Sequence, residues 1–369
     1  MHQVIIVGAG PAGAYLAYLL AREGIDVLLL EKEYLPRNKL CGGGISPKVI
    51  KLLDFDLNPV IENTIYKMII THRLGKPINV NSDQPIVYMS SRDQLDNYLV
   101  NKAKHAGATV LDGLRVKKVQ SVGKEVFVYT NEKVFSGSIL IGADGANSIV
   151  ARSFGLAKNR INTVAFESHV PLSQEKTDES RCTIRVDYGL VPKGYAWVFP
   201  KSNYLSVGVG STSPKIKGLD SYLNKWIRAE NFDVPALPQK KGWVIPLNPQ
   251  PNDLHNNNVI VIGDAGGLVD PVTGEGIYAA IYSACLAAQV ITEQVRQARP
   301  DLQRYTNLIL EKIKPEITNA FRFAGWFYLA SNLFHRFLGS HQETATGMMQ
   351  VISGNLTYAQ FFATLRPKM

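Results

Sequence analysis

Two apolar runs with a helical segment between them open the chain. "VIIVG" at residues 4–8 and "VLLLE" at 27–31 are almost continuously apolar, and apolar residues recur at helical spacing across 9–23, before Gly24. Such runs are typical of strands buried on both faces of a parallel sheet, and glycine commonly follows the end of a helix. The order therefore predicts a strand, a helix and a second strand parallel to the first.

Two later apolar runs have the same character, and each ends in glycine. They are "SILIGADG" at 138–145 and "NVIVIGDAGG" at 258–267, and they predict two further strands of the same sheet. Residues 91–107 predict another helix, because Ser91 and Gln94 have the spacing of a capping box and Gly107 follows its last turn.

The pattern changes in the second half of the chain. Residues 160–250 alternate more and carry many Pro, Gly, Ser and Thr residues, which predicts an inserted antiparallel sheet. From about residue 299 the pattern is helical and aromatic. Polar residues interrupt the segment 321–339, so it is expected to pack on the core, line a tunnel or lie on a membrane surface rather than cross a bilayer. The apolar run 278–291 predicts a buried core helix.

Cysteine usage and the N-terminus indicate the compartment. The three cysteines, Cys41, Cys182 and Cys285, are odd in number and lack metal-ligand spacing, which argues against a disulfide scaffold and a zinc site. The N-terminus shows neither the basic region nor the cleavage site of a signal peptide. We therefore expect a cytoplasmic protein without a bound metal.

The net charge of +9 is compatible with an anionic membrane, a phosphorylated cofactor or nucleic acid. The basic residues are spread along the chain, and no nucleic-acid-binding motif accompanies them. We therefore do not expect a nucleic-acid partner, and peripheral contact with a membrane stays open.

The first apolar run leads into "GAGPAG", which predicts a dinucleotide site. Gly8 permits a tight turn, Gly10 lets the backbone approach a pyrophosphate, and Gly13 allows close packing of the helix. The helix N-terminus then attracts phosphate groups. Glu31, at the end of the next strand, is suited to accept hydrogen bonds from a ribose.

Two further glycine segments indicate which dinucleotide is bound. "GADGANSIVAR" and "GDAGGLVDPVTGEG" resemble the second and third fingerprints of FAD-dependent oxidoreductases of the aromatic-hydroxylase type. Asp264 is placed to hold a ribityl hydroxyl, and Gly274 and Gly276 to let a helix N-terminus approach the flavin. The resemblance implies that Arg92 contacts the FAD phosphates or adenosine. Asp144 is expected either to contact FAD or to cap the next turn.

Residues within or beside these motifs complete the expected cofactor contacts: Ala12, Lys32, Lys39, Cys41, Gly42 and Ile277. A single dinucleotide-binding βαβ unit is recognisable in the sequence. NAD(P)H is therefore expected to bind transiently without its own domain, unless another carrier reduces the flavin.

The expected fold class is α/β, with a Rossmann-like FAD-binding βαβ domain, an inserted antiparallel-sheet substrate domain and a C-terminal helical region. The expected units are a discontinuous FAD-binding domain at 1–72, 92–158 and 255–298, a substrate-binding sheet domain at 73–91 and 159–254, and a helical region at 299–369.

Two more segments narrow the family. In "GYAWVFPK" at 194–201, alternation places Tyr195, Trp197 and Phe199 on one face of a strand, and "KLCGGGISP" at 39–47 pairs a cysteine with three glycines. With the FAD motifs, these segments resemble the geranylgeranyl reductase family, whose members saturate isoprenoid double bonds. Flavin-dependent halogenases carry Trp-x-Trp-x-Ile-Pro instead, and Tyr195 and Phe199 depart from that motif.

The resemblance implies an isoprenoid lipid or prenyl-chain substrate. Hydride addition to an unpolarised double bond requires a proton donor and a dry pocket that stabilises positive charge on carbon. Tyr195, Trp197 and Phe199 are candidates for that stabilisation, unless they form an ordinary core stripe. Cys41 is the candidate proton donor or steering group, unless it is a small packing residue.

Two other functions stay open at this point. One is a flavin-dependent monooxygenase acting on an apolar substrate, because the same fold supports that chemistry. The other is a membrane-associated, electron-carrying flavoprotein that binds lipid or quinone without turnover.

Overall fold

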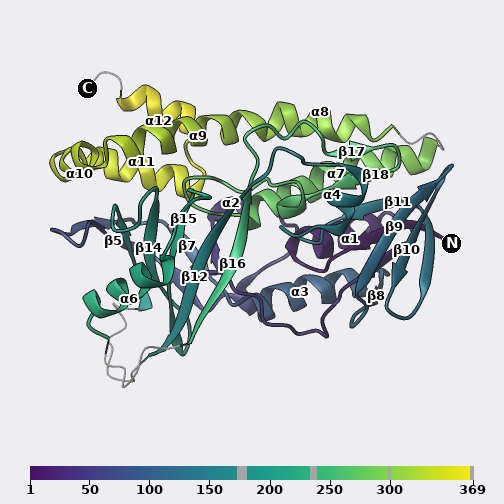
Figure 1. Cartoon of the computed structure of the whole chain (residues 1–369), viewed down its shortest axis with the longest axis horizontal. Helices are drawn as coiled ribbons and strands as arrows, with labels where there is room; N and C mark the ends of the chain where they lie inside the picture. The colour runs from purple at the N-terminus through teal and green to yellow at the C-terminus, as the bar shows by residue number, and fades with distance from the viewer. Residues whose placement is uncertain (173–180, 233–238, 298–300, 366–369) are drawn as a thin grey trace.

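The computed structural model describes residues 1–172, 181–232, 239–297 and 301–365. Two large sheets lie next to each other, and the C-terminal helices run along one side of both (Figure 1). The strands of a small third sheet come from residues 44–89, on either side of the first two strands of the second large sheet in the chain.

The first sheet contains the predicted parallel strands. In sheet order they are β17 (His255–Asn256), β18 (Val259–Val261), β11 (Val134–Gly142), β1 (His2–Val7), β2 (Val27–Leu30) and β8 (Thr109–Leu111), and the hairpin of β9 (Val116–Val122) and β10 (Glu125–Thr130) joins through β11. The pairings β1–β2, β1–β11 and β11–β18 are parallel, as the apolar runs predict. The carboxyl ends of β1, β11 and β18 therefore meet at one edge, where all three glycine motifs begin.

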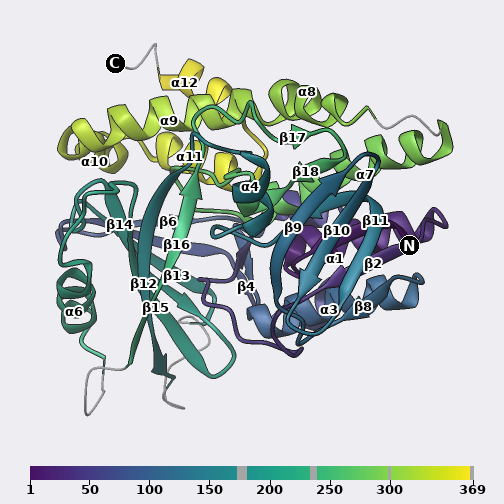
Figure 2. The ribbon, with the colours of Figure 1, turned by 45° about the vertical axis from the view of Figure 1, so that its right-hand side comes forward.

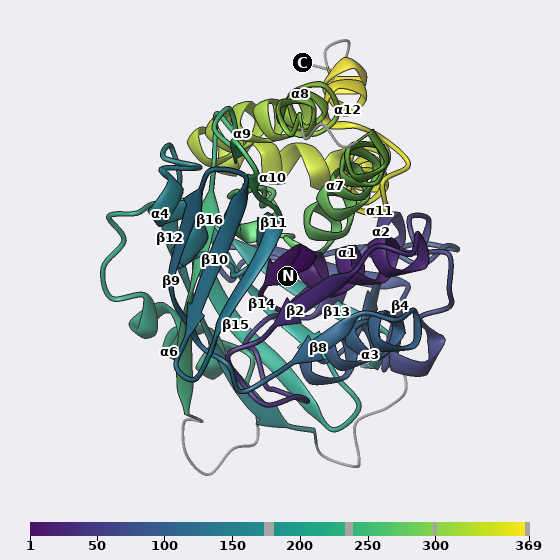
Figure 3. The same ribbon diagram turned by 90° about the vertical axis from the view of Figure 1, so that its right-hand side faces the viewer.

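Three helices pack beside this sheet. Helix α1 (Pro11–Arg22) lies between α7 (Ile277–Gln297) and α3 (Arg92–His105), as Figure 3 shows. The helices expected at 91–107 and 278–291 are thus confirmed. The capping box is not formed: Ser91 occupies the N-cap position of α3, but its side chain makes no capping hydrogen bond.

The second sheet contains the inserted segment. In sheet order its strands are β16 (Lys240–Leu247), β12 (Ile161–Pro171), β15 (Tyr204–Ser211), β14 (Gly194–Pro200), β13 (Thr183–Tyr188), β5 (Lys67–His72) and β6 (Ile78–Asn81). The pairs β12–β15, β14–β15 and β12–β16 are antiparallel, as predicted, whereas β13 pairs with β5 in parallel.

The expected boundary after residue 72 lies at the end of a strand of the second sheet. Residues 67–72 were assigned to the cofactor domain, but β5 forms hydrogen bonds with β13 along its whole length. This pairing joins segments more than a hundred residues apart, so local alternation could not reveal it. We therefore propose that the substrate-side unit begins at β5.

The two faces of β14 pack against different elements. Ala196 and Val198 face helix α6 (Leu219–Ala229), which covers one face of this sheet (Figure 2). Tyr195 and Phe199 face the opposite way and pack against a cluster that includes the C-terminal helices. Strand alternation therefore turns the predicted aromatic row toward the cofactor unit and the helices.

Short elements link the two large sheets. They are the small sheet of β3 (Gly44–Ile45), β7 (Val87–Met89) and β4 (Asn63–Ile65), helices α2 (Pro47–Ile50) and α4 (Ile149–Phe154), and the 3-10 turns η1 (Asn58–Val60) and η2 (Gly263–Ala265). The glycine-rich stretch Gly42–Gly44 thus leads directly into a strand held by β7.

The C-terminal region is helical, as predicted. Its elements are α8 (Gln303–Lys312), α9 (Lys314–Leu329), α10 (Ser331–Ser340), α11 (Gln342–Ser353) and α12 (Tyr358–Leu365). The segment 321–339 is split between α9 and α10, and its buried aromatic residues, among them Phe323, Phe327 and Phe334, pack in the cluster that reaches β14. No helix within the described ranges has the length and hydropathy needed to cross a bilayer.

Candidate cofactor and substrate site

The first glycine motif forms a close contact between β1, α1 and β11. Gly8 has a φ of +102°, and a Cβ there would lie 2.4 Å from the Ala143 carbonyl oxygen. A Cβ on Gly13 would lie 1.9 Å from the Gly8 carbonyl oxygen. Ala12 is buried in the first turn of α1, and a Cβ on Gly263 would lie 3.1 Å from the Ala12 Cβ. The first glycine motif thus packs against both later glycine segments, at Ala143 and at Gly263.

Gly10 has a different environment. A Cβ there would meet only two guanidinium groups, with the Nη2 atoms of Arg92 and Arg37 at 3.8 and 3.9 Å. Gly10 is the N-cap of α1 and supplies no side-chain cap, so the first turn of the helix keeps amide groups for an external acceptor. Two guanidinium groups beside a helix N-terminus suit the diphosphate of a dinucleotide.

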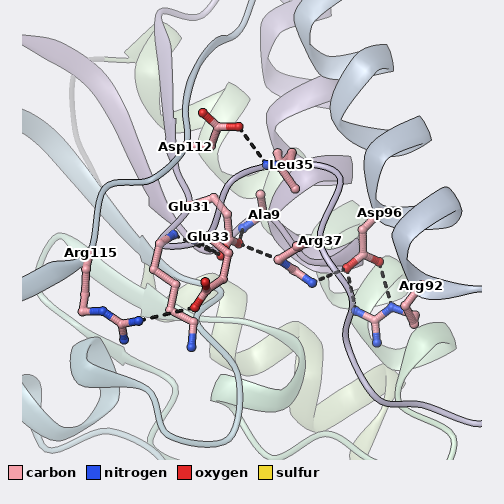
Figure 4. A network of polar contacts seen from close by, with 10 residues as sticks. Ala9, Glu31, Glu33, Leu35, Arg37, Arg92, Asp96, Asp112 and Arg115 are labelled. Atoms are coloured by element: carbon pink, nitrogen blue, oxygen red, sulfur yellow. Dashed lines mark hydrogen bonds and ion pairs between the residues drawn. The ribbon is translucent and has the colours of Figure 1, made fainter.

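A buried ion-pair network holds these two arginines (Figure 4). Asp96 is fully buried and binds Arg92 through two contacts of 2.8 Å, and it also lies 3.1 Å from Nη1 of Arg37. Desolvation lowers the pKa of Arg92, but Asp96 outweighs this effect and raises it overall. Asp96 therefore keeps Arg92 charged and fixes the orientation of both guanidinium groups.

Glu31 completes the network at the end of β2. Its carboxylate accepts hydrogen bonds from the main-chain N–H groups of Ala9 at 2.9 Å and Lys32 at 3.0 Å, and Arg37 Nε lies at 3.4 Å. Glu31 therefore fixes the glycine turn as well as lying where a ribose was expected. Arg37 was missed in the sequence, although its position between Glu31 and Lys39 could have suggested it.

Two lysines expected to contact the cofactor lie differently. The Lys32 residue is exposed. Lys39 also has exposed surface, yet its pKa is lowered by desolvation first and by Arg92 second, against Asp264 and Asp96. These neighbours place Lys39 between the Arg92–Asp96 pair and the third fingerprint.

The second fingerprint supports both expectations for Asp144. Its Oδ2 accepts hydrogen bonds from the N–H groups of Ile149 at 2.7 Å and Val150 at 3.3 Å, so it caps α4. Its Oδ1 is buried without a hydrogen-bond partner among the described residues, and desolvation raises the pKa of this carboxyl group. An orphaned buried acceptor indicates a further partner, which a cofactor hydroxyl would provide.

The third fingerprint is a loop held from three sides. Asp270 Oδ1 accepts hydrogen bonds from the N–H groups of Val272 and Thr273 at 2.7 and 2.9 Å, and the Tyr358 hydroxyl donates to Asp270 Oδ2 at 2.9 Å. The Tyr195 hydroxyl donates to the Thr273 carbonyl oxygen. On the third side, Glu275 accepts a hydrogen bond from Ser46 and lies 3.4 Å from Lys48 Nζ. Of these anchors, the sequence identified only Tyr195.

This loop places the first turn of α7 at the site. Ile277 is the first residue of α7, and a Cβ on Gly276 would lie 3.0 Å from Asp264 Oδ1. Gly274 has a φ of +69°, and a Cβ there would lie 3.2 Å from the Tyr195 hydroxyl oxygen. Both glycines therefore leave room for Asp264 and Tyr195 beside the loop, and their close approach to a flavin stays a prediction.

The aromatic row of β14 lies against the cysteine loop, residues Cys41–Gly44. A Cβ on Gly42 would lie 2.9 Å from the Phe199 ring and 3.5 Å from Trp197 Nε1. The ring centroids of Tyr195 and Trp197 are 5.7 Å apart, and those of Trp197 and Phe199 are 6.1 Å apart. Cys41 is partly buried, and its Sγ accepts a contact from Gly43 N at 3.4 Å.

Electrostatic effects also connect Cys41 with this site. Cys41 is among the groups that act on the pKa of Arg92 and of Tyr195. The structure thus brings together the first fingerprint, the cysteine loop and the aromatic strand, from segments that begin near residues 8, 41 and 195. The site therefore has a cationic end formed by Arg37 and Arg92, called the arginine cradle below. Its other end is aromatic.

We expect Arg37→Ala to weaken FAD binding by about tenfold or more, because it removes a cation beside Gly10 while Asp96 keeps Arg92 in place. Flavin titration of apoprotein, followed by fluorescence, measures the change. Arg115→Ala is the matched control, since Arg115 forms a similar but exposed ion pair with Glu33 at 3.4 Å. Equal affinities of the Arg37→Ala and Arg115→Ala proteins for FAD would show that Arg37 does not contribute to FAD binding.

Two similar proteins span most of the chain. An uncharacterised protein of Methanosarcina barkeri is 33% identical, covering 99% of this chain and 93% of the relative. Geranylgeranyl diphosphate reductase of Rhodobacter capsulatus is 32% identical, covering 81% of this chain and 77% of the relative.

Solved structures show the same fold. A geranylgeranyl bacteriochlorophyll reductase-like protein of Thermoplasma acidophilum superposes with a TM-score of 0.79 at 23% identity, covering 99% of this chain and 95% of the other. The flavin-dependent brominase Bmp2 superposes with a TM-score of 0.76 at 16% identity, covering 100% and 98%. At these identities the likeness concerns the fold alone.

The family model of the FAD-binding domain matches residues 1–209, which include the glycine turn, the arginine cradle and the aromatic strand. FAD is therefore the dinucleotide of this site, and the protein is an FAD-dependent oxidoreductase. Together with the Rhodobacter relative, this match shows that the chain belongs to the geranylgeranyl reductase family.

Proposed function

We propose that this protein saturates carbon–carbon double bonds of an isoprenoid chain. The observation that carries the proposal is the contact of Gly42 with Phe199 and Trp197, which sets the cysteine loop directly on the aromatic strand. The names of two relatives support the substrate class: geranylgeranyl diphosphate reductase and, at 27% identity, digeranylgeranylglycerophospholipid reductase of Methanocaldococcus jannaschii.

Bound and reduced, FAD supplies a hydride from N5 of its ring. An isolated trisubstituted double bond is not polarised, so a proton must arrive with or before the hydride, and positive charge develops on the more substituted carbon. The faces of Tyr195, Trp197 and Phe199 would stabilise such charge by roughly 0.5–2 kcal/mol each when desolvated.

Two of these aromatic side chains are fixed by hydrogen bonds. Trp197 donates from Nε1 to Ser206 Oγ at 3.2 Å, and Tyr195 donates to the Thr273 carbonyl oxygen. Burial, with Tyr328 nearby, raises the pKa of the Tyr195 phenol, so this hydroxyl is a weaker acid than an exposed tyrosine. These side chains therefore offer ring faces rather than protons, which leaves Cys41 as the candidate donor.

An apolar region adjoins the aromatic row. Tyr195 and Phe199 pack against a cluster with Phe323, Phe327 and Phe334 from α9 and α10. An isoprenoid tail placed beside this cluster would gain roughly 25 cal/mol for each Å² of apolar surface that it removes from water. The C-terminal helices thus provide an environment suited to an isoprenoid tail.

The electron donor is NAD(P)H or another carrier that binds transiently. Within the described ranges, one glycine-turn βαβ unit is present, in the first sheet, and FAD would occupy it. A donor would therefore reach the flavin without a second Rossmann domain.

The α9–α10 corner suits contact with a membrane that holds the substrate. Leu329 and Leu333 are 89% and 63% exposed, and Arg322 and Arg336 are exposed on the same two helices. Tyr328, next to Leu329, is close enough to Tyr195 to affect its pKa. An apolar and cationic corner beside the aromatic row fits an anionic bilayer surface.

Under anaerobic conditions, we expect enzyme carrying chemically reduced FAD to saturate geranylgeranyl diphosphate. Mass spectrometry should show products that have gained a hydride and a proton at one or more bonds. Oxygenated product formed only in air would instead identify a monooxygenase. Tight binding of FAD and lipid without any product would identify an electron carrier.

Cys41→Ser should lower the saturation rate by about tenfold or more, because general acid catalysis is typically worth at least that much. Single-turnover flavin reoxidation by substrate measures the rate, and absorbance measures FAD content, which should not change. Cys182→Ser is the control, since Cys182 is free and exposed. An unchanged rate would make the Cys41 thiol a packing group.

Replacing both Leu329 and Leu333 with Asp should reduce binding to vesicles of phosphatidylglycerol and phosphatidylcholine by about tenfold or more, since burying each leucine is worth about 1.5–3 kcal/mol. Co-sedimentation measures binding. Val122 and Val134, 60% and 57% exposed at the β9–β11 end of the molecule (Figure 1), provide the matched double-Asp control. Equal loss in both variants would contradict the assignment of the corner.

A further inference from the structure

Lys201 is a buried lysine directly beyond the aromatic strand. It continues the row of Tyr195, Trp197 and Phe199, and it is 1% exposed. Its Nζ donates to the carbonyl oxygens of Ser90 at 2.9 Å and Gly43 at 3.2 Å, and it lies 3.9 Å from Met89 Sδ. The ammonium group is thus held by main-chain acceptors from two other segments.

Burying this ammonium group is energetically unfavourable. Desolvation lowers the pKa of Lys201 to about 8, against the opposing effects of Glu62, Cys41 and Glu167. An apolar side chain would fill the same space without that penalty. The hydrogen bonds of the ammonium group to two main-chain carbonyls offset part of this penalty.

Those contacts converge on Gly43. Its φ is +65°, and a Cβ there would lie 2.4 Å from Lys201 Nζ and 2.1 Å from the Ser90 carbonyl oxygen. The Gly43 carbonyl oxygen also accepts a hydrogen bond from Ser90 N at 2.9 Å. One loop carbonyl thus has two donors, and its residue can only be glycine.

The bridge spans the parts that build the site. Gly43 lies two residues after Cys41, and Ser90 lies two residues before Arg92, which begins α3. Lys201 directly follows the strand whose Phe199 lies against Gly42. The cysteine loop, the start of α3 and the aromatic strand therefore share a single ammonium group.

We propose that Lys201 is the positioning residue that fixes the cysteine loop, Cys41–Gly44, against the start of α3 and the aromatic strand. It touches neither FAD nor substrate in this role, and it acts by holding the loop backbone. Its effect on turnover rests on the proposed function, whereas its effect on the loop does not.

The test uses the alkylation rate of Cys41 in FAD-loaded protein without substrate, resolved by peptide mass spectrometry. Lys201→Met should increase Cys41 labelling by about tenfold, the equivalent of losing one hydrogen bond to a charged group. The exposed Cys182 and the partly buried Cys285 serve as references within the same molecule, and both should label as in the wild type. Lys217→Met, at an exposed lysine, is the control.

Gly43→Ala provides an independent route to the same loop, because the added Cβ displaces Nζ and the Ser90 carbonyl without altering the lysine. Gly43→Ala should raise the rate of Cys41 labelling in the same way. If Lys201→Met does not fold, this variant alone tests whether the contact between Lys201 and Gly43 fixes the loop. Wild-type labelling of Cys41 in folded Gly43→Ala protein would overturn the proposal. So would wild-type labelling in folded Lys201→Met protein. Because no substrate is present, failure of the proposed reaction leaves either result intact.

Discussion

The close packing of backbone at the carboxyl ends of β1 and β11 is the constraint on which the site depends. The Ala143 carbonyl occupies the space that a Gly8 side chain would need, and the Gly8 carbonyl occupies that of Gly13. This contact brings the N-terminus of α1 to the edge of the sheet. The two guanidinium groups, the Asp96 bridge and the capping carboxylate of Asp144 are all arranged around it.

The second sheet and the C-terminal helices meet this edge through polar contacts, two of them to main-chain carbonyls and one to a carboxylate. Tyr195 binds the Thr273 carbonyl, Lys201 binds the Gly43 carbonyl, and Tyr358 binds the carboxylate that shapes the third fingerprint. Each contact joins a glycine-rich loop to a rigid strand or helix. Loops that must approach a flavin closely cannot carry bulky side chains, so neighbouring elements supply the groups that hold them in place.

The fold by itself does not select the chemistry. A brominase superposes over the whole chain, so the same fold occurs in proteins with different activities. In this chain, aromatic side chains face the cofactor unit. Tyr195, Trp197 and Phe199 form one continuous aromatic row, and a cluster of phenylalanines from the C-terminal helices extends it.

The sequence by itself determined the features that depend on neighbouring residues. The glycine turn, the parallel apolar strands, helices α1, α3 and α7, and the alternation of β14 follow from short patterns, because strand and helix periodicity are local. Only the tertiary structure decided that β5 joins the second sheet, that Arg37 shares Asp96 with Arg92, and that Lys201 and Tyr358 hold the cofactor loops. These contacts join residues about sixty to more than a hundred and fifty positions apart in the sequence. A local pattern does not indicate which distant carbonyl or carboxylate a side chain will contact, because that depends on how the sheets pack.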